Sequence, residues 1–130
     1  LPCARGAGVL VVFVRIAFRS NGADLPPGNA LFSTFFEARE IFHEGMAGTE
    51  VDLPVRDEDV VVLKRRASAF AGTDLDLVLR AHAVDTIAVA GVATSAMVAA
   101  TCVLGTQFIL VRGDTQVAAE TRPQPSYLNT

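Results

Sequence analysis

Four short runs of apolar residues divide the chain, and each has the composition of a buried strand. They are residues 9–16 (VLVVFVRI), 60–64 (VVVLK), 86–92 (TIAVAGV) and 108–113 (FILVRG). The runs are rich in Val and Ile and are continuous rather than alternating with polar residues. That pattern is typical of central parallel strands that are covered on both faces. The chain is therefore predicted to contain four parallel strands.

Segments with helical spacing of apolar residues separate these strands. Residues 29–45 have apolar side chains near one face, and Gly45 stands where a helix would end. The residues of this face are Leu31, Phe32, Phe35, Ile41 and Phe42. Residues 73–83 open with Thr73 and carry Asp76 three positions later, which is a capping-box pattern. These segments predict two helices.

A third helix is expected after Thr94, ending near Leu104 because Gly105 follows. Strands that alternate with helices in this way predict an α/β fold of three layers (α/β/α), in which helices cover a mostly parallel open sheet. With 130 residues, the chain is expected to form one domain over 1–130. Its last segment, 116–130, loses the periodicity at Pro123 and Pro125 and is predicted to be a loosely ordered tail.

Composition narrows the classes of partner. The chain is 51% hydrophobic and 19% charged, with a net charge of −3 and a single short basic cluster at residues 64–66, so nucleic acid is not the expected partner. No apolar run reaches ~18 residues, and no signal peptide is recognisable, so we expect no membrane span and a cytoplasmic location. Cys3 and Cys102 have neither metal-binding nor redox spacing, and we expect no metal and no cofactor.

Lys64 is a candidate site residue because it ends the second predicted strand and is the only lysine in the chain. Ligands of open α/β sheets bind beyond the carboxyl ends of the strands. A lysine buried there can have a lowered pKa and can orient an anion or a carboxylate. The alternative is a solvated lysine that belongs to a basic cluster with Arg65 and Arg66.

The segment GVATSAM, residues 91–97, is a second candidate, because it turns directly from a strand into a helix. Small residues let its backbone approach a ligand, and the first amides of the helix could stabilise a developing oxyanion. The alternative is an ordinary turn capped by Thr94 or Ser95. These two hydroxyls lack the context of a serine nucleophile. His43 and His82, the candidate bases, are too few for a zinc site, and His82 lies on an apolar helical face.

Residues 59–101 resemble the isochorismatase-like cysteine hydrolases. The family pattern is a strand that ends in Lys, an "aF…T-L…L" segment, a further strand, and then "G-V-x-T-x-x-C-V…T". The matching positions are Lys64, Phe70, Thr73, Leu75, Leu79, Gly91, Val92, Thr94, Val98 and Thr101. Weaker similarity extends to about residues 5–115 and includes VFVRIAFR (12–19), NALFSTF (29–35) and VRGD (111–114), which ends in Asp114.

The resemblance implies a Rossmann-like three-layer fold and hydrolysis of an amide or a vinyl ether. The amide-cleaving members use a Cys nucleophile, an Asp general base and an assisting Lys, the last matched here by Lys64. The implied pocket contains Phe70, Val92, Ala93 and Thr94. A cis peptide at Val92–Ala93 would direct the N–H groups of Ala93 and Met97 towards the oxyanion.

The chain departs from the family pattern at the nucleophile, where Met97 stands. A thioether has no proton to lose and cannot form a productive thioester. Cys102 cannot replace it, because five residues further along a helix point about 140° away. The strand that carries the family's Asp would precede residue 1. We therefore expect a chain that is truncated at both ends and lacks the first strand. A partner chain, an altered strand order or an incomplete gene product would each fit that gap.

Three functions follow from these patterns. The first is an isochorismatase-like hydrolase relative, of the branch without the cysteine nucleophile, that is catalytically impaired in thiol-dependent amide hydrolysis. The second is a non-catalytic module, a pseudoenzyme that binds a small molecule or mediates oligomerisation. The third is a truncated product without a function of its own. A small-molecule ligand and a homo-oligomer are the expected partners.

Overall fold

The computed structural model describes residues 1–93, 97–104 and 109–111. It divides into two compact units, Leu1–Arg65 and Arg66–Thr130, and each is described by itself. The predicted tail over 116–130 and Asp114, which ends the VRGD match, lie outside the described residues.

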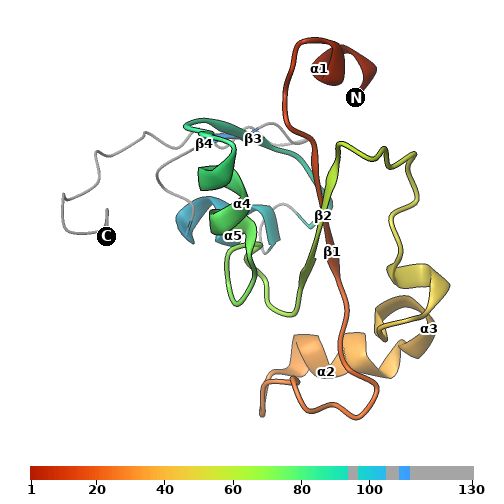
Figure 1. Ribbon diagram of the computed structural model, residues 1–130. Helices are drawn as coiled ribbons and strands as arrows, with labels where there is room; N and C mark the ends of the chain where they lie inside the picture. Colours follow the sequence, from red (N-terminus) through yellow and green to blue (C-terminus); the bar gives the residue numbers. More distant parts are fainter. Residues whose placement is uncertain (94–96, 105–108, 112–130) are drawn as a thin grey trace. The chain divides into compact units, whose positions relative to one another are not determined.

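The first unit is built around one pair of parallel strands (Figure 1). Val12 lies opposite Val60 in the register, and Ile16 lies opposite Lys64. The second strand has the predicted bounds, whereas the first begins three residues later than its apolar run. The elements of this unit are α1 (Pro2–Gly6), β1 (Val12–Ile16), α2 (Ala30–Glu37), α3 (Arg39–Phe42), the short 3₁₀ helix η1 (Ala47–Thr49) and β2 (Val60–Lys64).

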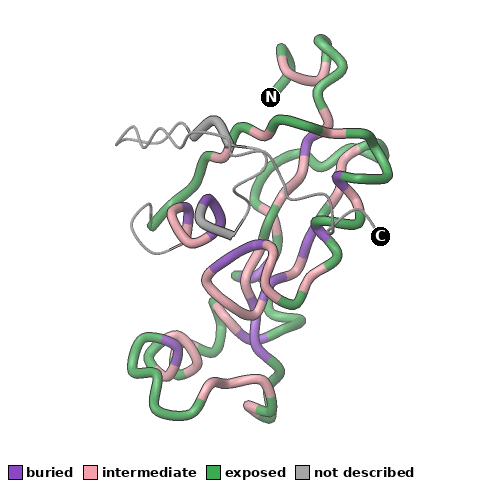
Figure 2. The backbone as a smooth tube through the Cα atoms, turned by 90° about the vertical axis from the view of Figure 1, so that its left-hand side faces the viewer, coloured by how far each residue is buried: buried purple, intermediate pink, exposed green. Residues whose placement is uncertain are grey.

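The core of this unit lies at the carboxyl end of β1. Ala17 and Phe18 follow the strand and are completely buried. Figure 2 shows the backbone of the chain coloured by burial, with buried residues in purple. The Phe18 ring meets that of Phe32 in α2 edge-on, with 5.6 Å between the centroids. The Phe18 amide donates to the Phe42 carbonyl (2.7 Å), and the Phe18 carbonyl accepts from the Glu44 amide (2.9 Å). The chain beyond β1 is therefore fixed both by packing and by backbone hydrogen bonds.

The helix predicted over 29–45 is divided in two at Ala38, whose ψ of 64° departs from helical geometry. Asn29 caps the first part, because its side-chain oxygen accepts a hydrogen bond from the Phe32 amide (3.1 Å). Gly45 has a left-handed φ of +86°. It does not cap the helix as predicted, since α3 ends at Phe42 and is followed by extended backbone.

The second unit repeats the alternation of strands and helices. β3 and β4 are parallel, with Ile87 opposite Ile109. Val98 and Cys102 form a buried cluster against which Val89 of β3 packs. The elements are α4 (Leu75–Ala81), β3 (Ile87–Val89), α5 (Ala99–Leu104) and β4 (Ile109–Val111).

The capping box predicted for the second helix is wrong. Asp74 is the N-cap residue of α4 and makes no side-chain capping bond. Thr73 accepts instead from the Leu75 amide (3.2 Å), and Asp76 bonds Arg80 within the helix (2.7 Å). The aspartate is thus drawn to a cation one turn further along and does not reach back to the helix start.

The predicted α/β class with parallel strands is confirmed. The predicted single four-stranded sheet is not found: among the described residues the strands form two parallel pairs, β1–β2 and β3–β4. Each pair completes its ladder within its own compact unit. No helix in the described part of the chain is long and apolar enough to cross a membrane.

Candidate functional site

Lys64 is the last residue of β2, and its side chain is buried rather than solvated. The residue is only 7% exposed, so the alternative of a solvated lysine does not hold. Its carbonyl accepts the Ala17 amide (3.2 Å), which fixes the strand end against the segment that follows β1. Burial lowers the pKa of the Lys64 amine, because an ammonium loses solvation there.

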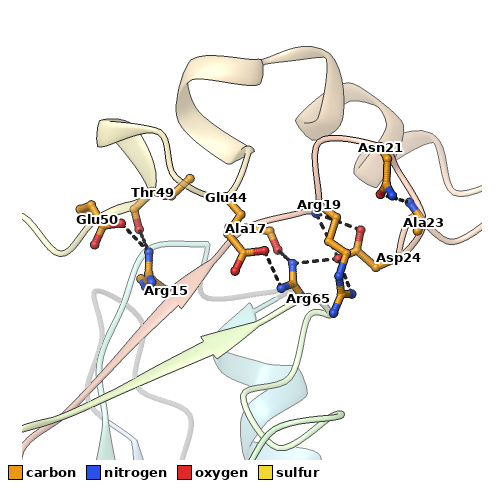
Figure 3. A network of polar contacts seen from close by, with 10 residues as sticks. All are labelled: Arg15, Ala17, Arg19, Asn21, Ala23, Asp24, Glu44, Thr49, Glu50 and Arg65. Atoms are coloured by element: carbon orange, nitrogen blue, oxygen red, sulfur yellow. Dashed lines mark hydrogen bonds and ion pairs between the residues drawn. The ribbon is translucent and has the colours of Figure 1, made fainter.

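Arg65, the next residue, contacts the segment after β1 and the segment after α3 (Figure 3). Its guanidinium donates to the Ala17 carbonyl (3.1 Å) and pairs with Asp24 and Glu44, both at 2.8 Å. Arg65 also lowers the pKa of Glu44, mainly by donating a hydrogen bond to its carboxylate. A planar guanidinium with several donors suits this role, because it can hold three acceptors at once.

Asp24 holds the loop that follows β1 (Figure 3). Its nearly buried carboxylate accepts from the Arg19 amide at 3.1 and 3.2 Å and also pairs with the Arg19 side chain at 3.5 Å. Asn21 supports the same loop by accepting the Ala23 amide (3.1 Å). Sequence reasoning did not find this cluster, because its acids and bases are far apart in the chain and carry no common motif.

The backbone after β3 differs from the prediction of a cis peptide at Val92–Ala93. The Val92–Ala93 peptide is trans, and no cis peptide occurs in the described ranges, so the cis prediction is wrong. Ala93 instead adopts a left-handed φ of +59°, which is uncommon for a residue other than glycine. Val92 is 93% exposed, and Ala93 is also exposed. Thr94 and Ser95 lie outside the described residues.

Met97 lies two residues before α5, and its amide donates a hydrogen bond within the chain. The Met97 N–H donates to the Ala93 carbonyl at 2.8 Å. That this N–H serves as an oxyanion donor stays a prediction, and in this structure the N–H donates within the chain. Val98, the next residue, is buried in the cluster with Cys102.

Phe70 lies in an irregular segment between β2 and α4, and side-chain hydroxyls hold its backbone. The Ser68 hydroxyl accepts the Phe70 amide at 3.2 Å. The Ala69 amide donates to the hydroxyl of Thr101 (3.0 Å), and the Thr73 hydroxyl donates to the Ala69 carbonyl (2.5 Å). The Phe70 ring is half-buried. This hydroxyl scaffold was not anticipated, although Thr73 and Thr101 both belong to the matched pattern.

Neither cysteine offers an accessible nucleophile beside Met97. Cys102 is buried in α5, and burial raises the pKa of its thiol, which reduces the thiolate available for attack. Cys3 is exposed, and no residue pattern matches it to the family nucleophile.

The two histidines differ in burial and in their contacts. His43 is buried and bonds the Phe36 carbonyl through Nε2 (2.9 Å), and its ring lies 4.5 Å from the Phe36 ring at a tilt of 34°. His82 is exposed just after α4, so its predicted place on an apolar face is wrong. No group of metal-binding side chains occurs among the residues that were placed.

These features can be compared with known proteins. A family model described as the isochorismatase domain matches residues 1–107 of the chain. The chain belongs to the isochorismatase family.

Relatives within the isochorismatase family support this assignment. YwoC of Bacillus subtilis (strain 168), an uncharacterized isochorismatase family protein, is 50% identical over 44 residues, which are 34% of this chain and 23% of YwoC. The crystal structure of a cysteine hydrolase from Pseudomonas syringae pv. phaseolicola 1448A is similar with a TM-score of 0.73 and 34% identity, over 81% of this chain. N-carbamoylsarcosine amidase from Thermoplasma acidophilum gives a TM-score of 0.67 with 25% identity, over 94% of this chain and 67% of the amidase.

The chain spans about half, 49%, of the length of the Pseudomonas cysteine hydrolase. The match fits the α/β arrangement and the parallel strand pairs described above. It places Lys64, Phe70 and the turn up to Met97 within the matched isochorismatase domain.

Proposed function

We propose that this isochorismatase-family chain binds a small carboxylate or carboxamide and does not carry out thiol-dependent hydrolysis. The observation that carries the proposal is Met97, which occupies the nucleophile position of the family pattern. A thiol mechanism needs a group that loses a proton and then forms a thioester with the acyl carbon. A thioether can do neither.

The second requirement of that mechanism, a set of donors aimed at the oxyanion, is also weakened at this turn. The Met97 amide donates to Ala93 at 2.8 Å and is not directed at a ligand. Removing a single oxyanion donor from a hydrolase costs about 10²–10³ in kcat. The lack of a thiol at residue 97 and the hydrogen bond made by the Met97 amide both argue against thiol-dependent hydrolysis.

We assign ligand binding to two places, one in each compact unit. The half-buried ring of Phe70 provides an apolar and aromatic surface. The buried amine of Lys64 provides a donor with a lowered pKa, which can hydrogen-bond a carboxamide or, when protonated, a carboxylate.

Turnover measurements test the catalytic half of the proposal. Purified chain is incubated with benzamide, an N-carbamoyl amino acid and a vinyl ether, before and after alkylation with iodoacetamide. We expect neither sample to release ammonia from the amides or a carbonyl product from the vinyl ether. Turnover that is lost on alkylation, or lost in Cys3→Ser or Cys102→Ser, would overturn the proposal.

Calorimetric titration with benzoate and benzamide tests the binding half. We expect saturable binding, and we expect Lys64→Met to weaken benzoate binding by about tenfold, which corresponds to one lost charged interaction. Arg66→Met is the matched control, because it removes an equal charge at a neighbouring position, and it should bind benzoate within about twofold of the wild type. Absence of binding for both ligands, or equal losses in the two variants, would contradict the assignment.

A further inference from the structure

The hydroxyl of Thr101 connects two parts of the second unit that are separated in the sequence. It accepts a hydrogen bond from the Ala69 amide at 3.0 Å. It also donates to the Met97 carbonyl at 2.9 Å, one helical turn back. One side chain therefore joins the segment that carries Phe70 to the residue at the nucleophile position.

This connection is buried and uses a single hydroxyl both as donor and as acceptor. Thr101 is 6% exposed, and Ala69 is also buried. A hydroxyl has one proton, which here goes to Met97, and the lone pairs of its oxygen receive the Ala69 N–H. If the hydroxyl were removed, the Ala69 amide would be left without an acceptor where water does not readily replace it.

The Phe70 segment depends on such bonds because no strand or helix holds it. Ala69 and Phe70 lie in a turn. The Ala69 carbonyl accepts from Thr73, and the Phe70 amide donates to Ser68. Those two bonds are local in the sequence, whereas the bond to Thr101 comes from another element. Thr101 is thus the member of the scaffold that sets where Phe70 lies relative to Met97.

We propose that Thr101 is a positioning residue, which sets the distance between the Phe70 ring and the Met97 side chain and thereby the ligand-binding geometry at this turn. The proposal rests on the proposed function, in which Phe70 contacts the ligand. Thr101 itself touches neither the ligand nor a reacting atom. It acts through the Ala69 amide on one side and through the Met97 carbonyl on the other.

The chain contains a matched control for the ordinary role of a threonine in a helix. Thr34 in α2 donates to the Ala30 carbonyl at 3.0 Å, which is the same bond to the fourth preceding residue. Thr34 is exposed, and among the described residues its hydroxyl accepts from no distant amide. A difference between the two threonines therefore measures the connection to Ala69 and not the helical bond.

Methionine methyl groups provide the spectroscopic reporter. The chain has two methionines, so ¹³C-methyl labelling gives one signal for Met97 and one for Met46. Met46 belongs to the first unit and serves as the internal reference. Sodium benzoate is the probe, and its titration midpoint is read from the Met97 signal, with benzamide as the neutral analogue.

We expect Thr101→Val to shift the Met97 signal and to raise the benzoate midpoint by about tenfold. Thr101→Ser, which restores the hydroxyl without the methyl group, should return the signal and the midpoint to within about threefold of the wild type. Thr34→Val should change neither, and the Met46 signal should stay constant throughout. Equal effects of Thr101→Val and Thr101→Ser would overturn the proposal, because the methyl group and not the hydrogen bonds would then matter.

The outcomes separate this proposal from the proposed function. If benzoate shifts no signal in the wild type, the binding assignment fails. The Met97 signals of Thr101→Val and Thr101→Ser without benzoate still show whether the position of Met97 depends on the Thr101 hydroxyl. If Thr101→Val does not fold, the wild type and Thr101→Ser decide. The Ala69 amide and the Met97 methyl group should then shift with one common benzoate midpoint in both proteins. Separate midpoints in either protein would refute the positioning role.

Discussion

Gly48 lies in η1 at a point where the structure has no room for a side chain. A Cβ atom added there would lie 2.5 Å from the Glu40 carbonyl oxygen and 2.8 Å from the Ile41 Cα. Both are backbone atoms of α3, so no side-chain rotation can relieve the overlap. The substitution Gly48→Ala must therefore push η1 and α3 apart.

The magnitude follows from the size of the overlap. Overpacking of this kind typically costs about 1–3 kcal/mol, and the backbone contacts place Gly48→Ala in the upper half of that range. For a chain of this length the midpoint of thermal unfolding falls by roughly 4 °C per kcal/mol. We expect a decrease of about 8–12 °C.

Two other glycines provide controls for this experiment. Gly6 at the end of α1 has no atom within 4 Å of the added Cβ and no left-handed backbone, so Gly6→Ala should leave the midpoint unchanged or slightly raised. Gly28 has equally open space but a φ of +73°, so Gly28→Ala measures backbone strain alone, about 1 kcal/mol.

Thermal unfolding followed by circular dichroism, together with urea titration, measures all three variants. The slope of the urea transition should be unchanged in Gly48→Ala if only the native state is affected. A midpoint for Gly48→Ala equal to that of Gly6→Ala would refute the packing of η1 on α3. Because α3 leads into His43 and Glu44, that result would also remove the support inferred for the Arg65 cluster.

Three further predictions concern titration and the turn after β3. Reductive ¹³C-methylation gives a single lysine signal, and its titration should show the pKa of Lys64 below the usual range. Between that lowered pKa and about 10.5 the unfolded chain binds more protons than the folded chain, so the unfolding free energy should rise with pH relative to Lys64→Met. A difference between the two proteins that does not change with pH would contradict the burial of Lys64. The Glu44–Arg65 pair should stabilise the chain at high pH and lose this effect in acid. Its contribution to the unfolding free energy is within about 1 kcal/mol, because Glu44 is half-exposed, and it is present above pH 4.5. The difference in unfolding free energy between the wild type and Glu44→Gln should disappear as pH falls through the lowered pKa of Glu44, and a difference that grows in acid would exclude the pair. Ala93→Gly should raise the unfolding free energy by up to about 1 kcal/mol, because glycine adopts the left-handed φ without strain. Ala83 has a φ of +51°, so Ala83→Gly should raise the unfolding free energy in the same way without changing benzoate binding. A loss of stability in Ala93→Gly would show that the conformation of Ala93 is unstrained.

The strands were predictable because their apolar runs are continuous and bounded by polar residues. β2 has the predicted bounds, since charged residues flank the Val run on both sides. The helix over 29–45 was predicted too long, because its apolar spacing continues across Ala38 although the backbone there does not. Hydrophobic periodicity records which face is buried and is insensitive to a local change in ψ.

The site was predictable where one residue and its position in an element were sufficient. Lys64 follows from its place at the end of an apolar strand, and the structure buries it there. The left-handed φ of Ala93 could not be predicted, because residues other than glycine seldom adopt it. The connection of Thr101 to Ala69 was equally hidden, because a threonine hydroxyl carries no sequence signal for a distant partner.

We propose that this isochorismatase-family chain forms no acyl-thioester. The most direct test is the intact mass of the chain when it is quenched in acid during incubation with a carboxamide such as benzamide. We predict that the wild-type mass is unchanged at every time point, because Met97 cannot be acylated and Cys102 is buried with a raised pKa. A mass increase of one acyl group that maps to a cysteine and decays with turnover would contradict the claim.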